Sequence, residues 1–341
     1  MKLGLELGYS QRDMDIPMDL VLEAERLGYD SCWTAEAWGS DAVTPLAWIA
    51  AQTKKIKLGA GIMQVPARTP AMCAMTAMTL DKLSGERFIL GLGPSGPQVI
   101  EGWHGVPYQP SLTRLKEYVQ IVRAILQREA PLEFSGRCYQ LPYTGEGSSG
   151  QGIALKSILH GRATMKIYTA ATTPAGIEAA AEVADGFLPI LCDPERFDVF
   201  EAPIEAGLKK RGGKDLHEFE ILPSVTVNLG NNLQDCLDAY KPNLALYIGG
   251  MGSRRKNFYK DIAVELGFEA ESEKIQELYL SGHKKEAIAA VPNALVDAVT
   301  LSGPKERVAE RIGRWKSTGS STLIVITRDV SVLRLMAELV L

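Results

Sequence analysis

The sequence predicts an α/β fold, specifically a (β/α)8 TIM barrel, on the strength of two observations. Short apolar segments typical of strands alternate with helical segments along the chain of 341 residues, and eight such pairs follow one another. Strands separated by helices pair in parallel through right-handed crossovers, and eight of them favour a barrel. No change of composition marks a boundary, so we expect a single domain over residues 1–341.

The expected elements follow in regular order. Proline near the start and glycine at the end bound the helical segments 15–28 and 69–85, as is typical of helix termini. The stretch from about 231 to 300 is too long for one unit, and we interpret it as a helical insertion on the seventh. The expected strands are 2–8, 29–36, 56–63, 87–93, 165–171, 187–191, 219–229 and 321–327, and the other expected helices are 43–53, 111–129, 173–186, 193–212 and 329–341.

The composition argues against several classes of protein. The formal charge is −4 with no long block of one sign, which argues against nucleic acid or an anionic membrane as a partner. The N-terminus lacks a signal-peptide pattern and no segment suggests a membrane span, so we expect a cytoplasmic protein. Five cysteines without C-x-x-C spacing indicate reduced thiols. No metal site is expected, because metal-ligand spacing is missing from the four histidines His104, His160, His217 and His283.

The segment "FILGLGPSGP" (88–97) contains the spacing G-x-G-x-x-G directly after an apolar strand. That spacing is typical of Rossmann turns, in which a helix follows at once and its N-terminus binds a pyrophosphate. Here Pro94 and Pro97 each remove an N–H donor, and the glycine- and proline-rich stretch 96–110 predicts no immediate helix. We therefore interpret the segment as a loop at the C-terminal end of the fourth barrel strand.

Active sites of such barrels lie at the C-terminal ends of the strands, where unusual residues of this chain gather. Glu6 interrupts an apolar alternation; it either contacts a ligand at the floor of the site or forms a core ion pair with Arg68 or Arg87. Glu36 can act as a general acid or orient a ligand, and the alternative is a helix cap beside a solvated loop. The residues concerned are Glu6, Gly8 and Tyr9; Glu36, Trp38 and Asp41; Gln64 and Arg68; Ser95; and Thr172 and Thr173.

The segment "ATTPAG" (171–176) predicts the start of a helix. Thr173 suits the N-cap position and Pro174 the first helical position, which leaves free N–H groups behind two hydroxyls. Such an N-terminus binds phosphate readily, and the alternative is an ordinary capped helix.

Three further features have more than one interpretation. His104, in "EGWHG" beside the glycine loop, is a candidate proton donor or substrate contact. The segment "GGMGSRRKNFY" (249–259) could bind an anionic tail, form a solvated loop or contact another subunit. The stripe of Met72, Met75 and Met78 is predicted to lie in the core.

Two motifs of the chain resemble those of a known family. The motifs "TLDKLSGERFILGLG" and "AAEVADGFLP", and the stretch 33–105 around the first, resemble the luciferase-like monooxygenase superfamily, specifically its coenzyme F420-dependent oxidoreductases. The similarity runs from residue 2 to about 327. It implies a barrel with an insertion, usually a homodimer, and a deazaflavin bound at the C-terminal ends of the strands.

The resemblance also implies roles for individual residues. A non-prolyl cis peptide behind the deazaflavin ring matches Gly61–Ile62, and the phosphate-binding turn matches "TTPAG" (172–176). Trp38 and Trp103 are expected to face the substrate. The residues expected to contact the cofactor are Glu6, Gly8, Ala60, Gly61, Ile62, Gln64, Gly93, Pro94, Ser95, Thr172, Thr173, Ala175 and Gly176.

One departure from the family pattern bears on the reaction. Alcohol and sugar dehydrogenases of the family carry Asp-His-aromatic after the second strand, whereas this chain has Glu36-Ala37-Trp38. The missing histidine argues against alcohol oxidation and favours reduction of a C=C, C=O or imine bond by the reduced deazaflavin. The proton then comes from Glu36, the first choice, or from Tyr9, His104 or water. The alternatives are a monooxygenase that uses FMN and a non-catalytic barrel that binds flavin or deazaflavin.

Overall fold

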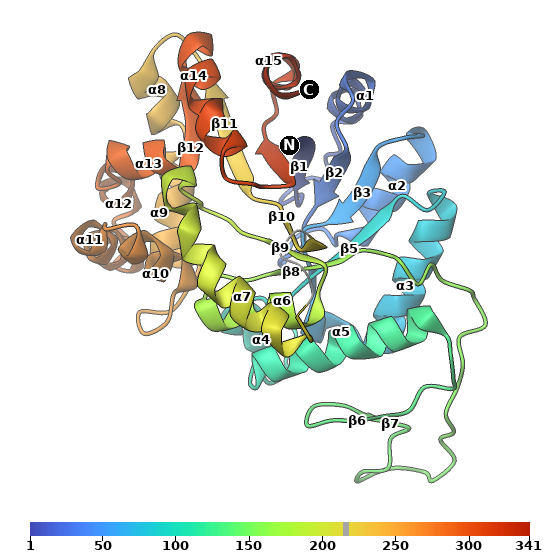
Figure 1. Ribbon diagram of the computed structural model, residues 1–341. Coiled ribbons are helices and arrows are strands. Elements are labelled where there is room, and N and C mark those ends of the chain that lie inside the picture. Colours follow the sequence, from blue (N-terminus) through green and yellow to red (C-terminus); the bar gives the residue numbers. More distant parts are fainter. Residues whose placement is uncertain (214–217) are drawn as a thin grey trace.

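The computed structural model describes residues 1–213 and 218–341, and its centre is a curled sheet in which all strand pairings are parallel (Figure 1). His217 lies outside the described residues. Across the sheet the strands are β10 (Glu220–Ile221), β9 (Gly186–Leu188), β8 (Ile167–Ala170), β5 (Phe88–Gly93), β3 (Lys57–Ala60), β2 (Ser31–Thr34), β1 (Lys2–Gly8), β13 (Thr322–Ile326), β11 (Ser224–Leu229) and β12 (Thr300–Gly303), with the short β4 (Met63–Gln64) beside β5.

The two ends of the sheet meet in one stretch of chain. β10 and β11 are separated only by Leu222 and Pro223, although they lie near opposite ends of the strand order. The N–H of Leu222 donates to the carbonyl of Phe187 in β9 at 3.0 Å, and the N–H of Ile324 in β13 donates to the carbonyl of Pro223 at 2.8 Å. This stretch therefore pairs with β9 on one side and β13 on the other, which confirms the predicted barrel order.

Helices between the strands cover the outside of the sheet, as the periodicity predicts. In α5, Leu115, Tyr118 and Val122 lie at helical spacing and are buried. Thr69 caps α3 by accepting a hydrogen bond from the N–H of Met72. The helices are α1 (Met18–Leu27), α2 (Val43–Gln52), α3 (Pro70–Leu83), α4 (Pro97–Gly102), α5 (Ser111–Gln127), α6 (Pro174–Val183), α7 (Glu201–Lys210), α14 (Lys305–Lys316) and α15 (Val330–Val340), with 3-10 turns at η1 (Val65–Ala67) and η2 (Pro194–Phe200).

The long segment after β11 is helical and gathers at one side of the sheet (Figure 1). It ends in β12, a strand that the sequence did not indicate, which pairs with β11 from Thr226↔Thr300 to Leu229↔Gly303. A separate excursion carries the hairpin of β6 (Phe134–Ser135) and β7 (Gln140–Leu141) away from the barrel. The helices of the segment are α8 (Leu233–Asp238), α9 (Lys241–Gly250), α10 (Phe258–Glu265), α11 (Glu269–Leu280), α12 (Lys284–Ala289) and α13 (Asn293–Val299).

Two glycines of "GLGPSG", Gly91 and Gly93, allow close packing against neighbouring parts of the barrel. A Cβ on Gly91 would lie 1.8 Å from the carbonyl oxygen of Ala60 in β3, and one on Gly93 would lie 2.9 Å from the side chain of Ile62. The prediction that no helix follows at once is wrong, because α4 begins at Pro97. Proline costs no hydrogen bond at the first helical position, so it permits this short helix instead of preventing it.

The prediction of a core methionine stripe is only partly right. Met78 is buried, but Met72 and Met75 are 51% and 55% exposed. A spacing of three residues drifts by about 60° at each step around a helix, so the first two side chains leave the buried face.

The homodimer that the family resemblance implies stays a prediction, which sedimentation velocity can test. No helix in the two described ranges is both long and apolar enough to cross a membrane.

Candidate active site

One large pocket lies where the barrel strands end. It encloses about 1550 Å³ and is lined by strand ends on one side and by residues of α8, α9 and α10 on the other. Its floor is apolar and consists of barrel-core residues from four strands or strand connections, namely Trp33, Leu188, Leu222 and Ile324. A pocket of this size with an apolar floor and a polar rim is suited to a large ring ligand.

The structure brings most of the predicted site residues together in this pocket. Ala60, Trp103, His104 and Ala175 are outside its lining, and Trp103 is 66% exposed. The Gly61–Ile62 peptide bond is cis, as the resemblance implies. The predicted residues that line the pocket are Glu6, Gly8, Tyr9, Glu36, Trp38, Gly61, Ile62, Gln64, Gly93, Pro94, Ser95, Thr172, Thr173 and Gly176.

Glu6 lies half-buried on β1 and borders the pocket. The two arginines proposed as its ion-pair partners bind elsewhere. Arg68 pairs with Glu36, and Arg87 donates to the carbonyls of Ala50, Thr53, Ile56 and Ser84. The alternative of a core ion pair with these arginines is therefore wrong. Burial raises the pKa of Glu6 to about 7, so this carboxyl can hold a proton near neutral pH.

Three tyrosines line the same pocket as Glu6, and two of them, Tyr240 and Tyr247, lie close enough to feel its charge. Tyr9 comes from the end of β1, whereas Tyr240 and Tyr247 come from the helical segment after β11. Burial raises the pKa of all three phenols, and the charge of Glu6 contributes to the rise for Tyr240 and Tyr247. The rings of Tyr247 and Tyr259 pack edge to face, with their centroids 4.7 Å apart. These phenols therefore stay protonated at neutral pH and can donate hydrogen bonds within the pocket.

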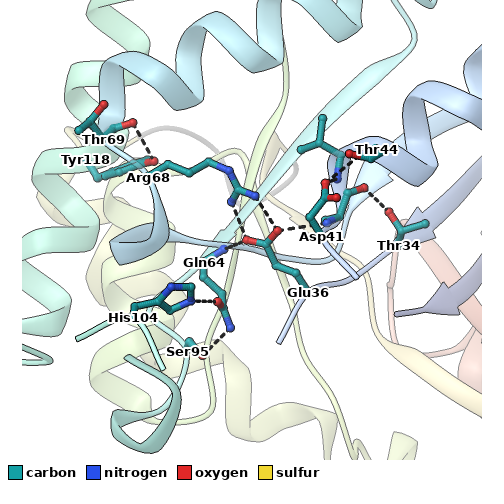
Figure 2. A network of polar contacts seen from close by, with 12 residues as sticks. Thr34, Glu36, Asp41, Thr44, Gln64, Arg68, Thr69, Ser95, His104 and Tyr118 are labelled. Atoms are coloured by element: carbon teal, nitrogen blue, oxygen red, sulfur yellow. Dashed lines mark hydrogen bonds and ion pairs between the residues drawn. The ribbon is translucent and has the colours of Figure 1, made fainter. Parts of the chain in front are cut away.

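Glu36 occupies the centre of a polar network between the β2 and β3 connections (Figure 2). One carboxylate oxygen accepts hydrogen bonds from Nη1 of Arg68 at 2.6 Å and from the N–H of Gln64 at 2.7 Å. The other accepts from Nη2 of Arg68 at 2.8 Å and from the N–H of Ala42 at 3.1 Å. The hydrogen bond with Glu36 raises the pKa of Arg68. The carboxylate therefore fastens two loops together through four hydrogen bonds.

Gln64 links this network to His104 and Ser95. Its Oε1 lies 2.7 Å from Nε2 of His104, and its Nε2 donates to Oγ of Ser95 at 3.1 Å (Figure 2). Gln64 and Ser95 line the pocket, whereas His104 lies behind them. His104 therefore contacts the site through Gln64.

The N-terminus of α6, which follows β8, supplies part of the polar rim of the pocket. Thr173 is its N-cap and accepts a hydrogen bond from the N–H of Gly176 at 3.2 Å, with Pro174 at the first helical position. Thr172 and Thr173 line the pocket beside this N-terminus. Hydroxyls together with helix N–H groups are the donors that bind phosphate oxygens.

The sequence did not indicate the pocket residues of the helical segment. Tyr240 and Tyr247 are seven residues apart, which is consistent with one helix face, but nothing in the sequence says that this face turns toward the barrel. Asn228, at the end of β11, also lines the pocket and was not among the predicted site residues. Only the packing of the segment on the sheet places these residues.

Comparison with known proteins agrees with this architecture. The family model described as luciferase-like monooxygenase matches residues 2–322. The chain belongs to this family. The resemblance noted from the motifs is thereby confirmed.

Among luciferase-like relatives, a Mycobacterium tuberculosis protein that carries the name coenzyme F420-dependent oxidoreductase is 41% identical over 343 residues, covering 100% of this chain and 99% of the relative. The 5,10-methylenetetrahydromethanopterin reductase of Archaeoglobus fulgidus is 25% identical over 325 residues, covering 95% and 92%. The structure of a coenzyme F420-dependent tetrahydromethanopterin reductase from Methanopyrus kandleri superposes with a TM-score of 0.80 at 24% identity, covering 99% and 98%, and supports the fold.

Proposed function

We propose that this luciferase-like protein is a coenzyme F420-dependent oxidoreductase that reduces a C=C, C=O or imine bond of a small organic substrate. The observation that carries the proposal is the environment of Glu6, a pocket carboxyl that pairs with no arginine among the described residues and whose pKa is raised to about 7 by burial. The names of the relatives favour the deazaflavin over FMN.

The residues present fit such a cofactor. A tricyclic ring needs a broad cavity, and the pocket of about 1550 Å³ provides it beside Gly61, Ile62 and Gly93. A Cβ on Gly8 would meet no atom within 4 Å, so this edge of the pocket is open. The α6 N-terminus with its two threonines would hold the phosphate.

The protein's own contribution is to orient the reactants and supply a proton. When bound, the reduced deazaflavin supplies a hydride from C5 to the substrate. Glu6 would donate its proton to the atom of the substrate that gains negative charge. A pKa near 7 suits this role, because the carboxyl is largely protonated near neutral pH and is still acidic enough to transfer its proton. Glu36 is a poorer donor than the sequence suggested, because its oxygens already accept four hydrogen bonds.

The tyrosines favour substrates that accept hydrogen bonds. Tyr240, Tyr247 and Tyr9 line the pocket and remain neutral donors, since burial raises the pKa of each. A carbonyl or imine presents a lone pair to such donors, and their hydrogen bonds strengthen as charge develops on that atom. This set of donors supports the reduction of a polarised double bond.

The proposal is tested by titrating the purified protein with oxidised F420 and, separately, with FMN while following cofactor fluorescence. We expect saturable binding of the deazaflavin and markedly weaker binding of FMN. Preferential binding of FMN would move the assignment to flavin-dependent oxygen chemistry. Binding of neither cofactor would overturn the enzymatic proposal.

A further inference from the structure

We infer that His104 is a positioning residue that fixes the amide of Gln64 with its NH2 group toward the ligand, so that Gln64 donates a hydrogen bond to an acceptor atom on the ring of the bound cofactor. The inference rests on the proposed function for the identity of that ring. It adds to that function a hydrogen-bond donor in the pocket, Gln64, and a residue behind it, His104, that determines which end of the Gln64 amide faces the ligand.

The side-chain amide of Gln64 is held at both ends, by His104 and by Ser95. A side-chain amide has a carbonyl end that only accepts and an NH2 end that only donates, and a half-turn exchanges them. The carbonyl Oε1 lies 2.7 Å from Nε2 of His104. Because an amide oxygen only accepts, this contact is a hydrogen bond in the tautomer, or the charged form, in which Nε2 carries a hydrogen and donates it. Nε2 of Gln64 donates to Oγ of Ser95 at 3.1 Å. His104 therefore holds the carbonyl away from the pocket.

One hydrogen of the Gln64 amide has no acceptor among the described residues. Gln64 is only 2% exposed and lines the pocket together with Ser95. Its NH2 group has two hydrogens, and in the described part of the chain only Ser95 accepts one of them. A buried donor without an acceptor is costly, so a ligand acceptor at this wall is expected to take up the second.

Backbone hydrogen bonds hold both His104 and Gln64 in place. The backbone N–H of His104 donates to the carbonyl of Val99 in α4 at 3.1 Å, which fixes the residue just after this helix. Gly105 follows with a φ of 68°. The backbone N–H of Gln64 donates to Glu36 at 2.7 Å. Both ends of the His104–Gln64 contact are thus anchored to the backbone, as a positioning role requires.

The position of Gln64 selects the ring as the ligand group. β4, which contains Gln64, follows directly after Gly61 and Ile62, and it pairs with the end of β5 at Gly93. These three residues line the part of the pocket assigned to the tricyclic ring, whereas the phosphate site lies at α6. The ring of a deazaflavin carries carbonyl oxygens and a ring nitrogen that accept hydrogen bonds, which matches an NH2 donor.

The test compares wild type with His104→Phe, which removes the donor, and His104→Gln, which restores an N–H at a similar reach. His160→Phe, at an exposed position, is the matched control. Each protein is titrated with oxidised F420, and the absorption spectrum of the bound deazaflavin is recorded, because a hydrogen bond to the ring changes that spectrum. Melting temperatures measured without cofactor verify that each variant is folded.

We expect His104→Phe to weaken deazaflavin binding about tenfold, the value of one hydrogen bond, and to shift the bound spectrum toward that of the free cofactor. His104→Gln should restore both, and His160→Phe should change neither. Ser95→Ala, which frees the other end of the amide, should shift the spectrum in the same direction. Wild-type affinity and spectrum in His104→Phe would overturn the inference alone, whereas wild type that binds no deazaflavin would overturn it together with the proposed function.

Discussion

Glu36 and Arg68 form a two-point ion pair that connects the loop after β2 to the turn after β4, with N–O distances of 2.6 and 2.8 Å. The Glu36 side chain is 6% exposed and that of Arg68 20% exposed, so water screens the pair little. The remaining acceptor positions of Glu36 bind the backbone of Ala42 and Gln64. The pair therefore fixes the pocket wall between these two loops.

Replacing Glu36 with Gln should destabilise the protein by about 2 kcal/mol, because Arg68 would lose the charge that compensates its burial. The measurement is urea unfolding followed by circular dichroism. Glu86→Gln is the matched control, since Glu86 pairs with Lys82 on the surface and exposed pairs contribute about 0–1 kcal/mol. Unchanged stability in Glu36→Gln would contradict the structural role of the pair.

Replacing Glu6 with Gln should lower the rate of substrate reduction at least about a hundredfold, the range typical of a general acid. In wild type, the rate should fall as pH rises above about 7, because the carboxyl then loses the proton that it donates. Glu6→Gln should lack this dependence. A wild-type profile that stays flat from pH 6 to 9 would assign the proton to another group.

Glu6 also makes stability depend on pH. Its pKa is raised from 4.5 in the unfolded chain to about 7 in the folded protein, so the unfolded chain binds fewer protons between these values. The stabilisation present below pH 4.5 is therefore lost as pH rises to about 7, and the loss is constant above. We expect Glu6→Gln to melt at a higher temperature than wild type at pH 8 and at a similar temperature at pH 4.5. Calorimetry at both values measures this, and equal melting temperatures at pH 8 would contradict it.

Gly91 and Gly313 differ in what a methyl group would meet. A Cβ at Gly91 would overlap the carbonyl oxygen of Ala60 at 1.8 Å, whereas one at Gly313, in α14, would meet nothing within 4 Å. Gly91→Ala should therefore lose several kcal/mol or fail to fold. Gly313→Ala should gain about 0.5–1 kcal/mol through helix propensity. Thermal melts of the two variants give the comparison, and a well-folded Gly91→Ala protein would disprove the close packing of β3 and β5.

The barrel could be predicted from the sequence because strand and helix periodicities alternate through its whole length. β12 and α4 could not, since four and six residues are too few to establish a period. The strand ends correctly located Glu6, Gln64 and Ser95 at the pocket. The partner of Glu36 could not be assigned, because Arg68 lies 32 residues away and the choice between carboxylates depends on loop geometry.

The positions of His104, Tyr240 and Tyr247 in the site could not be predicted either, because they depend on tertiary packing. His104 was recognised by its residue type, but its place behind Gln64 depends on α4, which was not expected. Tyr240 and Tyr247 belong to a helical segment whose packing on the barrel is a tertiary property. Residue chemistry at strand ends is therefore readable from sequence, whereas contacts between distant loops are not.

The most direct test of the central claim is an anaerobic assay in which reduced F420 is mixed with the protein and a panel of enones, quinones and imines, and deazaflavin absorbance is followed. We predict that at least one acceptor oxidises the cofactor without oxygen, and that Glu6→Gln slows this reaction at saturating cofactor. Oxidation that needs oxygen, or that proceeds equally fast in Glu6→Gln, would contradict it.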